Sequence, residues 1–483
     1  MPINSQHPDY KAHADRWVRI RDTVAGSDAV KAAGAKYLRR PEALSSQAFS
    51  EYVASATFYG ASGRTLHGLT GAVFRKDPII EVPERAAPLV ATATPDGTPF
   101  TVFAKNTVKE VIAMGRAGVL VDVGGTGTPY AARYVAENIL NWRTTNIAGK
   151  PVLTLLVLRE PGQRPKEDDR FELESVDRFR VCELVRVQNR NGLQYQVSVY
   201  EHAPGPGGNE FELVLVEGPL TPMRSGQPLD FIPFTFFGPT SLSPSVDPSP
   251  LLPLVDVNIS HFNTSACLEH GSWWTSLPVY IVSGNFQGGD MPSRLSVGSS
   301  VAWNLEPGAD AKILEYTGQG LGALELRLER KEAHMAVLGA RLLEDQKAGV
   351  EAAATVAMRH RGENSLLASI ANTASRGLSQ VLSTMAWWNG GQPASATVEL
   401  NTDFFEAPLP PDGLLKLVGA WQQGGIGGRT LHHNLLKGER LPEGMTFEDW
   451  HEDIETFGPG AVIGGLSMFG EDEDEEENLN GPN

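Results

Sequence analysis

Apolar residues recur at helical spacing through the first 76 residues of the chain. Trp17, Ile20 and Val24 lie three or four residues apart, which places them on one face of a helix. A second stripe of this kind is formed by Phe58, Leu66, Leu69 and Val73. Because Pro78 cannot continue a helix, we expect the helical region, residues 6–76, to end before it.

Beyond this region the pattern changes from helical to strand-like. Helical spacing predicts a further helix over residues 103–120, and the apolar run from Gly118 to Val123 predicts a strand. Short β-rich runs separated by turn residues then fill residues 151–237. The strands predicted there are Val152–Leu158, Phe179–Val187, Tyr195–Tyr200 and Glu210–Val216. Helices and strands in separate stretches of the chain predict the α+β fold class.

Proline, serine and glycine cluster between residues 237 and 253, which indicates a linker. A helix is predicted over residues 254–273, and a second β-rich region with many glycines over residues 276–318. A long charged helix follows. The remaining predicted elements are a helix from Leu366 to Trp388, a strand from Ala396 to Asn401, and short helices up to Phe457.

The long helix, predicted over residues 321–345, has three distinct surfaces when each residue is given 100° of rotation. Its apolar seam consists of Leu321, Leu324, Leu328, Met335, Leu338 and Leu342. One charged face consists of Glu325, Glu329 and Glu332. Nearly opposite it, the other consists of Arg327, Arg330 and Lys331. The seam lies between these two faces.

Such charge segregation is unfavourable in an isolated helix. Glu325 with Glu329, and Arg327 with Lys331, are like-charged pairs four residues apart, and each costs about 0.2–0.5 kcal/mol. The acidic face of one copy can instead meet the basic face of the next copy. That contact is head-to-tail and generates a ring when the rotation closes. The alternative is a charged solvent face above a core-facing seam.

A joint of small residues, including Gly349 and the alanines that follow, separates this helix from the next. Arg359, His360 and Arg361 form a basic cluster at the same break. On an acidic ring, we interpret this cluster as an inward-facing loop that meets phosphate briefly, with an ordinary surface loop as the alternative. We expect a cap at Asn364 and Ser365 to start the next helix.

Composition excludes several function classes. The chain has 483 residues and a net charge of −17, which argues against a basic surface that grips nucleic acid. The seven acidic residues from Glu471 to Glu477 predict a disordered tail. Cys182 and Cys267 show neither metal-ligand spacing nor a disulfide framework, and we expect both to be small buried side chains. No signal peptide or long apolar run is present, so we expect a soluble chain without a membrane partner.

No catalytic, metal or cofactor motif is complete. Gly124, Gly125 and Gly127 follow a strand, but Tyr130 occupies the third glycine position of a dinucleotide-binding loop, so we predict a turn. His432 and His433 are adjacent on a predicted helix and point about 100° apart, so we predict solvated histidines. We therefore predict no catalytic residue, no metal and no cofactor.

The order of these features resembles the portal proteins of tailed bacteriophages. The resemblance covers most of the chain, and no single motif carries it alone. The segments that carry it are Thr57–Leu69, Val73–Lys76, Gly118–Asp122, Tyr134–Arg143, Met335–Leu343 and Gly424–Trp450. Portals are rings, usually of twelve subunits, at one capsid vertex, where double-stranded DNA is packaged and ejected through a central channel.

The resemblance implies a portal architecture. Its parts would be a wing (1–250 and 365–400), two stem helices (251–275 and 319–346), a clip (276–318), a channel loop (347–364), a helical crown (401–460) and the acidic tail (461–483). The implied partners are other copies of the chain, DNA, the terminase motor, a tail adaptor and the major capsid protein. The implied locations are the virion and, during assembly, the host cytoplasm.

An acidic channel suits DNA that must slide, because each phosphate-binding cation adds to affinity through counterion release. The candidate exceptions are Lys347, Arg359, His360 and Arg361. Two other function classes stay open. A head–tail adaptor is disfavoured because adaptors are typically shorter and mostly helical. A nucleic-acid-processing enzyme is disfavoured because no catalytic motif is complete.

Overall fold

A computed structural model describes most of the chain. The described residues are 3–125, 127–166, 168–186, 192–204, 211–276, 279–283, 308, 310–314, 320–340, 366–404, 411–437, 440–442 and 444–457. The chain divides into two compact units, Met1–Thr402 and Asp403–Asn483, and each is described by itself. Both helices and antiparallel sheets are present, so the predicted α+β class is confirmed.

The helical character predicted for residues 6–76 is confirmed. The helices are α1 (Pro8–Ala25), α2 (Ser27–Ala32), α3 (Ser46–Ser55) and α4 (Ala61–Val73), with a 3-10 turn η1 (Gly34–Lys36). His7 caps α1, because its side chain accepts a hydrogen bond from the amide of Asp9. Gly26, at φ 105°, separates α1 from α2. Trp17 and Ile20 are fully buried, as their spacing predicts.

The helix predicted over residues 103–120 is α6 (Phe100–Met114), and it ends six residues early. Gly115 adopts a left-handed conformation with φ 73°, and a Cβ atom there would lie 2.9 Å from two backbone oxygens. The predicted strand follows as β2 (Ala117–Val123). It pairs with β3 (Pro129–Val135) and β11 (Phe234–Phe237) in an antiparallel sheet of order β11-β2-β3.

The glycines after β2 form a turn between antiparallel strands, because Gly127 donates its amide hydrogen bond to the carbonyl of Gly124. The predicted turn is therefore confirmed. The remaining short elements of this unit are β1 (Ile79–Glu81), η2 (Glu84–Ala86), α5 (Ala87–Ala91), η3 (Ala136–Asn138), β9 (Met223–Arg224) and β10 (Gln227–Pro228).

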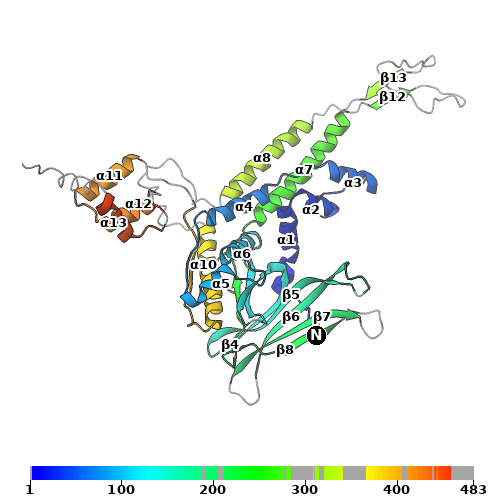
Figure 1. Ribbon diagram of the computed structural model, residues 1–483. Coiled ribbons are helices and arrows are strands. Elements are labelled where there is room, and N and C mark those ends of the chain that lie inside the picture. The colour runs from blue at the N-terminus through cyan, green and yellow to red at the C-terminus, as the bar shows by residue number, and fades with distance from the viewer. Residues whose placement is uncertain are drawn as a thin grey trace, which may run out of the picture. The chain divides into compact units, whose positions relative to one another are not determined.

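A five-stranded antiparallel sheet forms the β-rich part of the chain (Figure 1). Its order follows the sequence: β4 (Ile139–Ile147), β5 (Lys150–Pro165), β6 (Leu173–Arg186), β7 (Leu193–Pro204) and β8 (Phe211–Leu220). The four strands predicted between residues 151 and 237 are confirmed as β5 to β8. Strands β3 and β4 were not predicted from the sequence pattern.

Helix α10 (Leu366–Trp388) holds the short strand β14 (Thr397–Glu399) through a row of serines. The hydroxyls of Ser375, Ser379 and Ser383 bond to backbone atoms of Leu400, Val398 and Ala396, respectively. The serines are four residues apart on the helix, a rise of about 6 Å, and their partners are two residues apart along the strand, about 6.6 Å. The spacing of the serines therefore matches the spacing of their partners. The other edge of β14 pairs with β1, which satisfies the strand on both sides.

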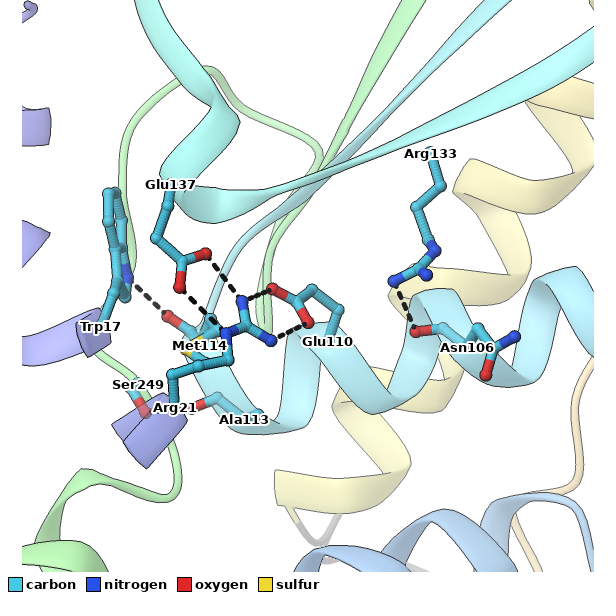
Figure 2. A network of polar contacts seen from close by, with 9 residues as sticks. All are labelled: Trp17, Arg21, Asn106, Glu110, Ala113, Met114, Arg133, Glu137 and Ser249. Atoms are coloured by element: carbon cyan, nitrogen blue, oxygen red, sulfur yellow. Dashed lines mark hydrogen bonds and ion pairs between the residues drawn. The ribbon is translucent and has the colours of Figure 1, made fainter. Parts of the chain in front are cut away.

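Arg21 of α1 joins α6 to η3 (Figure 2). Its Nη2 atom lies 2.7 Å from Glu110 Oε1 and 2.7 Å from Glu137 Oε2. Its Nη1 and Nε atoms donate further hydrogen bonds to the same two carboxylates. Burial lowers the pKa of Arg21, but its bonds to these carboxylates outweigh burial and raise that pKa above its ordinary value. Nearby, Trp17 donates its indole N–H to the carbonyl of Met114.

We expect Arg21→Ala to reduce the free energy of unfolding by about 2–4 kcal/mol at pH 7, because it leaves Glu110 buried beside a second carboxylate without a cation. Urea unfolding at pH 7 measures the loss.

The exposed Arg16 on the same helix provides the control, since Arg16→Ala should change stability by less than about 0.5 kcal/mol. A loss for Arg21→Ala that is no larger than the loss for Arg16→Ala would show that the ion pairs with these two carboxylates do not stabilise the fold.

The second unit contains α11 (Pro411–Gln422), α12 (Gly428–Lys437) and α13 (Phe447–Phe457). Leu431, Leu435 and Trp450 form its core. His432 belongs to the same inner face of α12, being only 7% exposed, and its ring packs against Trp450. The prediction of a solvated histidine is therefore wrong for His432, because this amphipathic helix turns that position inward. His433 is exposed, as predicted.

The two cysteines differ in exposure. Cys182 is fully buried, and burial raises the pKa of its thiol to about 12. Cys267 is exposed on α7 (Leu252–Ser276), so the prediction of a buried side chain is wrong there. The acidic tail lies outside the described residues.

Candidate inter-subunit surface on helices α7 and α8

Helix α8 (Leu321–Ala340) packs along α7 in an antiparallel pair (Figure 1). Leu321, near the start of α8, lies against Gly271, near the end of α7, where an added Cβ atom would be 2.7 Å from its side chain. Midway along the pair, Lys331 and Glu332 of α8 contact Ser260 and His261 of α7. The helices predicted over residues 254–273 and 321–345 are confirmed as far as the described residues extend.

The apolar seam of α8 faces α7 of the same chain. Met335 is 2% exposed, and the seam leucines that are described, Leu321, Leu324, Leu328 and Leu338, are half-buried. Leu342 lies outside the described residues. The seam is therefore core-facing, and any contact with another copy has to use the charged flanks and the outer face of α8.

Two of the six predicted stem residues, Lys331 and Glu332, border the seam and bond to α7. Lys331 Nζ donates to Ser260 O at 2.7 Å and to Thr264 Oγ1 at 2.6 Å. Burial and, less strongly, the nearby Arg327 lower the pKa of Lys331. Glu332 Oε1 lies 3.2 Å from the ring Nε2 of His261. These two charges hold the helix pair together within one chain.

The other four, Glu325, Glu329, Arg327 and Arg330, are exposed. Among the described residues we find no ion-pair partner for any of them. At 100° per residue the two glutamates and the two arginines project from opposite flanks of α8. Between the flanks, on the side away from α7, Leu326 and Val337 are 46% and 47% exposed. The outer side of α8 is thus an apolar stripe with an acidic edge and a basic edge.

Helix α7 is fixed to the N-terminal helices by buried polar residues that the sequence analysis did not single out. Asn258 Oδ1 accepts hydrogen bonds from the amide and hydroxyl of Ser62, and Asn258 Nδ2 donates to Tyr59 O at 2.6 Å. His261 is 4% exposed and packs against the ring of Tyr59. The available signal was the weak segregation of apolar and polar residues around this helix, which indicates contacts on several sides.

The far end of the pair leads to β12 (Val279–Ser283) and β13 (Asp310–Leu314), which pair antiparallel. Four apolar side chains at this end are exposed, namely Trp273 at 64%, Tyr280 at 39%, Ile281 at 42% and Ile313 at 56%. Within the region predicted as β-rich over residues 276–318, the described residues are these two strands, Gly308, and Ser276 at the end of α7. The four DNA-contact candidates, Lys347, Arg359, His360 and Arg361, lie outside the described residues.

Within the described residues, no three His, Cys, Asp or Glu side chains are grouped so that they could hold a metal ion. None of the helices in the described part of the chain combines the length and apolar character needed to cross a membrane.

A family model, "Domain of unknown function (DUF4055)", matches residues 250–389, the stretch that contains α7, α8 and α10. No curated protein matches the chain. Among solved structures, similar chains occur in the neck of the empty gene transfer agent (GTA) particle solved with C6 symmetry, in the virion of the native GTA particle, and in the native neck solved with C12 symmetry.

The chain from the empty neck is 14% identical with a TM-score of 0.35, and the match covers 76% of this chain and 86% of that one. The virion chain is 14% identical with a TM-score of 0.36, covering 83% and 95%. The native neck chain is 13% identical with a TM-score of 0.34, covering 84% and 95%. These TM-scores are too low to establish a shared fold, so the function is argued from the chain's own residues.

Proposed function

We propose that this chain is a structural subunit of a portal ring at one vertex of a phage-like capsid. The ring would be the conduit for double-stranded DNA and the docking site for the terminase motor, a tail adaptor and the major capsid protein. It would assemble in the host cytoplasm and remain in the virion. The subunit has no catalytic role in this proposal, because the motor partner supplies the chemistry.

One observation carries the proposal: the outer side of α8 has opposite charges on opposite flanks while its seam is already used by α7. Each flank therefore complements the other flank of an identical helix. A contact between unlike surfaces of identical chains is head-to-tail, and it closes into a ring or continues into a filament. A ring provides the central channel that a conduit needs.

In this proposal α7 and α8 are the stem, and the pair β12–β13 belongs to the clip. Residues 1–250 with 365–400 form the wing, residues 347–364 the channel loop, and residues 401–460 the crown. The exposed apolar side chains around β12 and β13 suit a clip that binds other proteins, because grouped exposed apolar residues mark interaction sites.

Particle assembly without this chain tests the proposal against the adaptor alternative. A portal acts before packaging, so its absence should give capsids that contain no DNA. A head–tail adaptor acts after packaging, so its absence should give DNA-filled heads without tails. The second outcome would assign the chain to the adaptor class.

The channel loop leads to a separate prediction. Replacing Lys347, Arg359 and Arg361 together with alanine should leave rings intact and change the length or retention of packaged DNA, because each lost cation removes a phosphate contact. Gel analysis of DNA from purified particles measures this. The control removes three exposed cations elsewhere, with Lys11, Arg16 and Lys105 changed to alanine. Unchanged genome length and retention in the loop variant would contradict the assignment.

A further inference from the structure

Strand β8 is the last strand of the five-stranded sheet, and its side chains do not match that position. The run Leu213–Val216 is apolar without interruption, a pattern typical of strands that are buried on both faces. Yet Val214, Leu215 and Val216 are 40%, 48% and 51% exposed, and neighbours in a strand point to opposite faces. Both faces of this strand are therefore only half covered.

Most of the apolar run on β8 lacks the features that keep edge strands apart. Proteins protect such edges with lysine, proline or bulges. On β8 these features are confined to its end, because the register irregularities involve Val216 and residues 218–219, and Pro219 lies among them. Residues 213–215 contain no irregularity, no proline and no charge, and Glu212 and the exposed Glu217 flank the run. This edge has the character of a strand that is covered in the assembled protein.

The opposite edge of the same sheet, β4, offers a complementary stretch. Its beginning is covered by the N-terminal segment, because His7 donates its amide to the carbonyl of Leu140 at 2.9 Å. From Arg143 to Asn146 the strand is exposed. This stretch contains two β-branched threonines and the basic Arg143, and the exposed Lys150 follows at the start of β5. A basic edge at β4 thus complements the acidic end of the β8 run.

We propose that β8 of one copy pairs with residues 143–147 of β4 in the next copy, so that the sheets of neighbouring subunits join edge to edge. The proposal rests on the ring proposed above. All five strands are antiparallel to their neighbours, so β4 and β8 run in the same direction. Pairing between head-to-tail copies is therefore parallel. The contact joins unlike edges and is compatible with a closed ring.

Site-directed cross-linking tests this pairing in the assembled full-length chain. Cys267→Ser removes the exposed native thiol, and Thr144→Cys with Leu215→Cys supplies one thiol on each edge. A short bis-maleimide should then produce a ladder of covalent multimers on a denaturing gel. Each single-cysteine variant should produce none. Moving the β8 cysteine to Phe171, which is 81% exposed in the β5–β6 connection, serves as the matched control.

A second variant asks whether the apolar run is needed. Val214→Lys with Val216→Lys should reduce the cross-linked fraction at least about tenfold, because a charged edge resists pairing. Leu173→Lys, at a residue 55% exposed on β6, should not reduce it.

Rings that give no ladder, or covalent dimers from Leu215→Cys alone, would overturn the β4–β8 pairing and leave the ring itself standing. A chain that forms no ring at all would contradict the pairing and the proposed function together. Cross-linking to the capsid protein instead of a second copy would also overturn the pairing.

Discussion

In the proposed ring, Glu325→Lys combined with Glu329→Lys should separate the subunits into single chains. Both residues are exposed on one flank of α8, so the fold should be unaffected. An exposed ion pair contributes about 0.2–1 kcal/mol, and reversing one charge replaces that attraction with a similar repulsion. Two reversed contacts cost about 1–4 kcal/mol per interface, which weakens each interface by about fivefold to a thousandfold. Sedimentation velocity at low salt measures the change.

The complementary flank provides the decisive controls. Arg327→Glu with Arg330→Glu should dissociate the ring in the same way, and the fourfold exchange should restore it because opposite charges face each other again. Glu42→Lys with Glu84→Lys changes the same number of exposed charges away from α8 and should leave rings intact. The fourfold variant combines the four substitutions on the two flanks. Charge pairing between the α8 flanks would be contradicted if each double variant forms rings and the fourfold variant stays monomeric.

Arg116→Ala should produce the largest loss of stability, about 3–5 kcal/mol. Arg116 is 1% exposed, and its guanidinium lies 4.1 Å from the ring of Trp142 and 4.8 Å from that of Phe236. Its Nη1 atom donates to Pro244 O at 2.8 Å and to Ser245 O at 3.3 Å. Alanine removes all these contacts and leaves a cavity beneath the segment before α7.

Methionine at the same position separates packing from charge. Burial lowers the pKa of Arg116 to about 9, although Asp9 and Asp247 raise it, so the buried charge itself has a cost. No carboxylate among the described residues forms a direct ion pair with it. Arg116→Met fills the space without that charge and should lose only about 1–2 kcal/mol. Thermal or urea unfolding compares the two variants, and equal losses would contradict a packing role.

The sequence pattern predicted those features that depend on residues close to one another in the chain. The seam of α8 was predicted from residues three and four positions apart, and the structure places those that it describes against α7. The same spacing did not reveal that Lys331 and Glu332 bond to Ser260 and His261, because those partners are about 70 residues away. The ion pairs of Arg21 with Glu110 and Glu137 could not be predicted from residue spacing either, because these partners are also far away in the sequence.

The predictions that differ from the structure do so for local reasons. Strands β3 and β4 were missed because the turns around them are short, and the chain there mixes apolar and polar residues without clear alternation. The helical pattern continues past Met114, but α6 ends there because Gly115 adopts the left-handed conformation of a C-terminal cap. Cys267 and His432 were assigned by residue type, whereas their exposure depends on which face of α7 or α12 they occupy.

Native mass spectrometry of the purified full-length chain at low ionic strength tests the central claim most directly. A closed ring predicts one dominant species whose mass is a fixed multiple of 52.2 kDa, twelvefold if the portal resemblance holds. The Glu325→Lys/Glu329→Lys variant should lose that species. A single mass of 52.2 kDa for the unmodified chain, both in dilute solution and when released gently from particles, would contradict the ring.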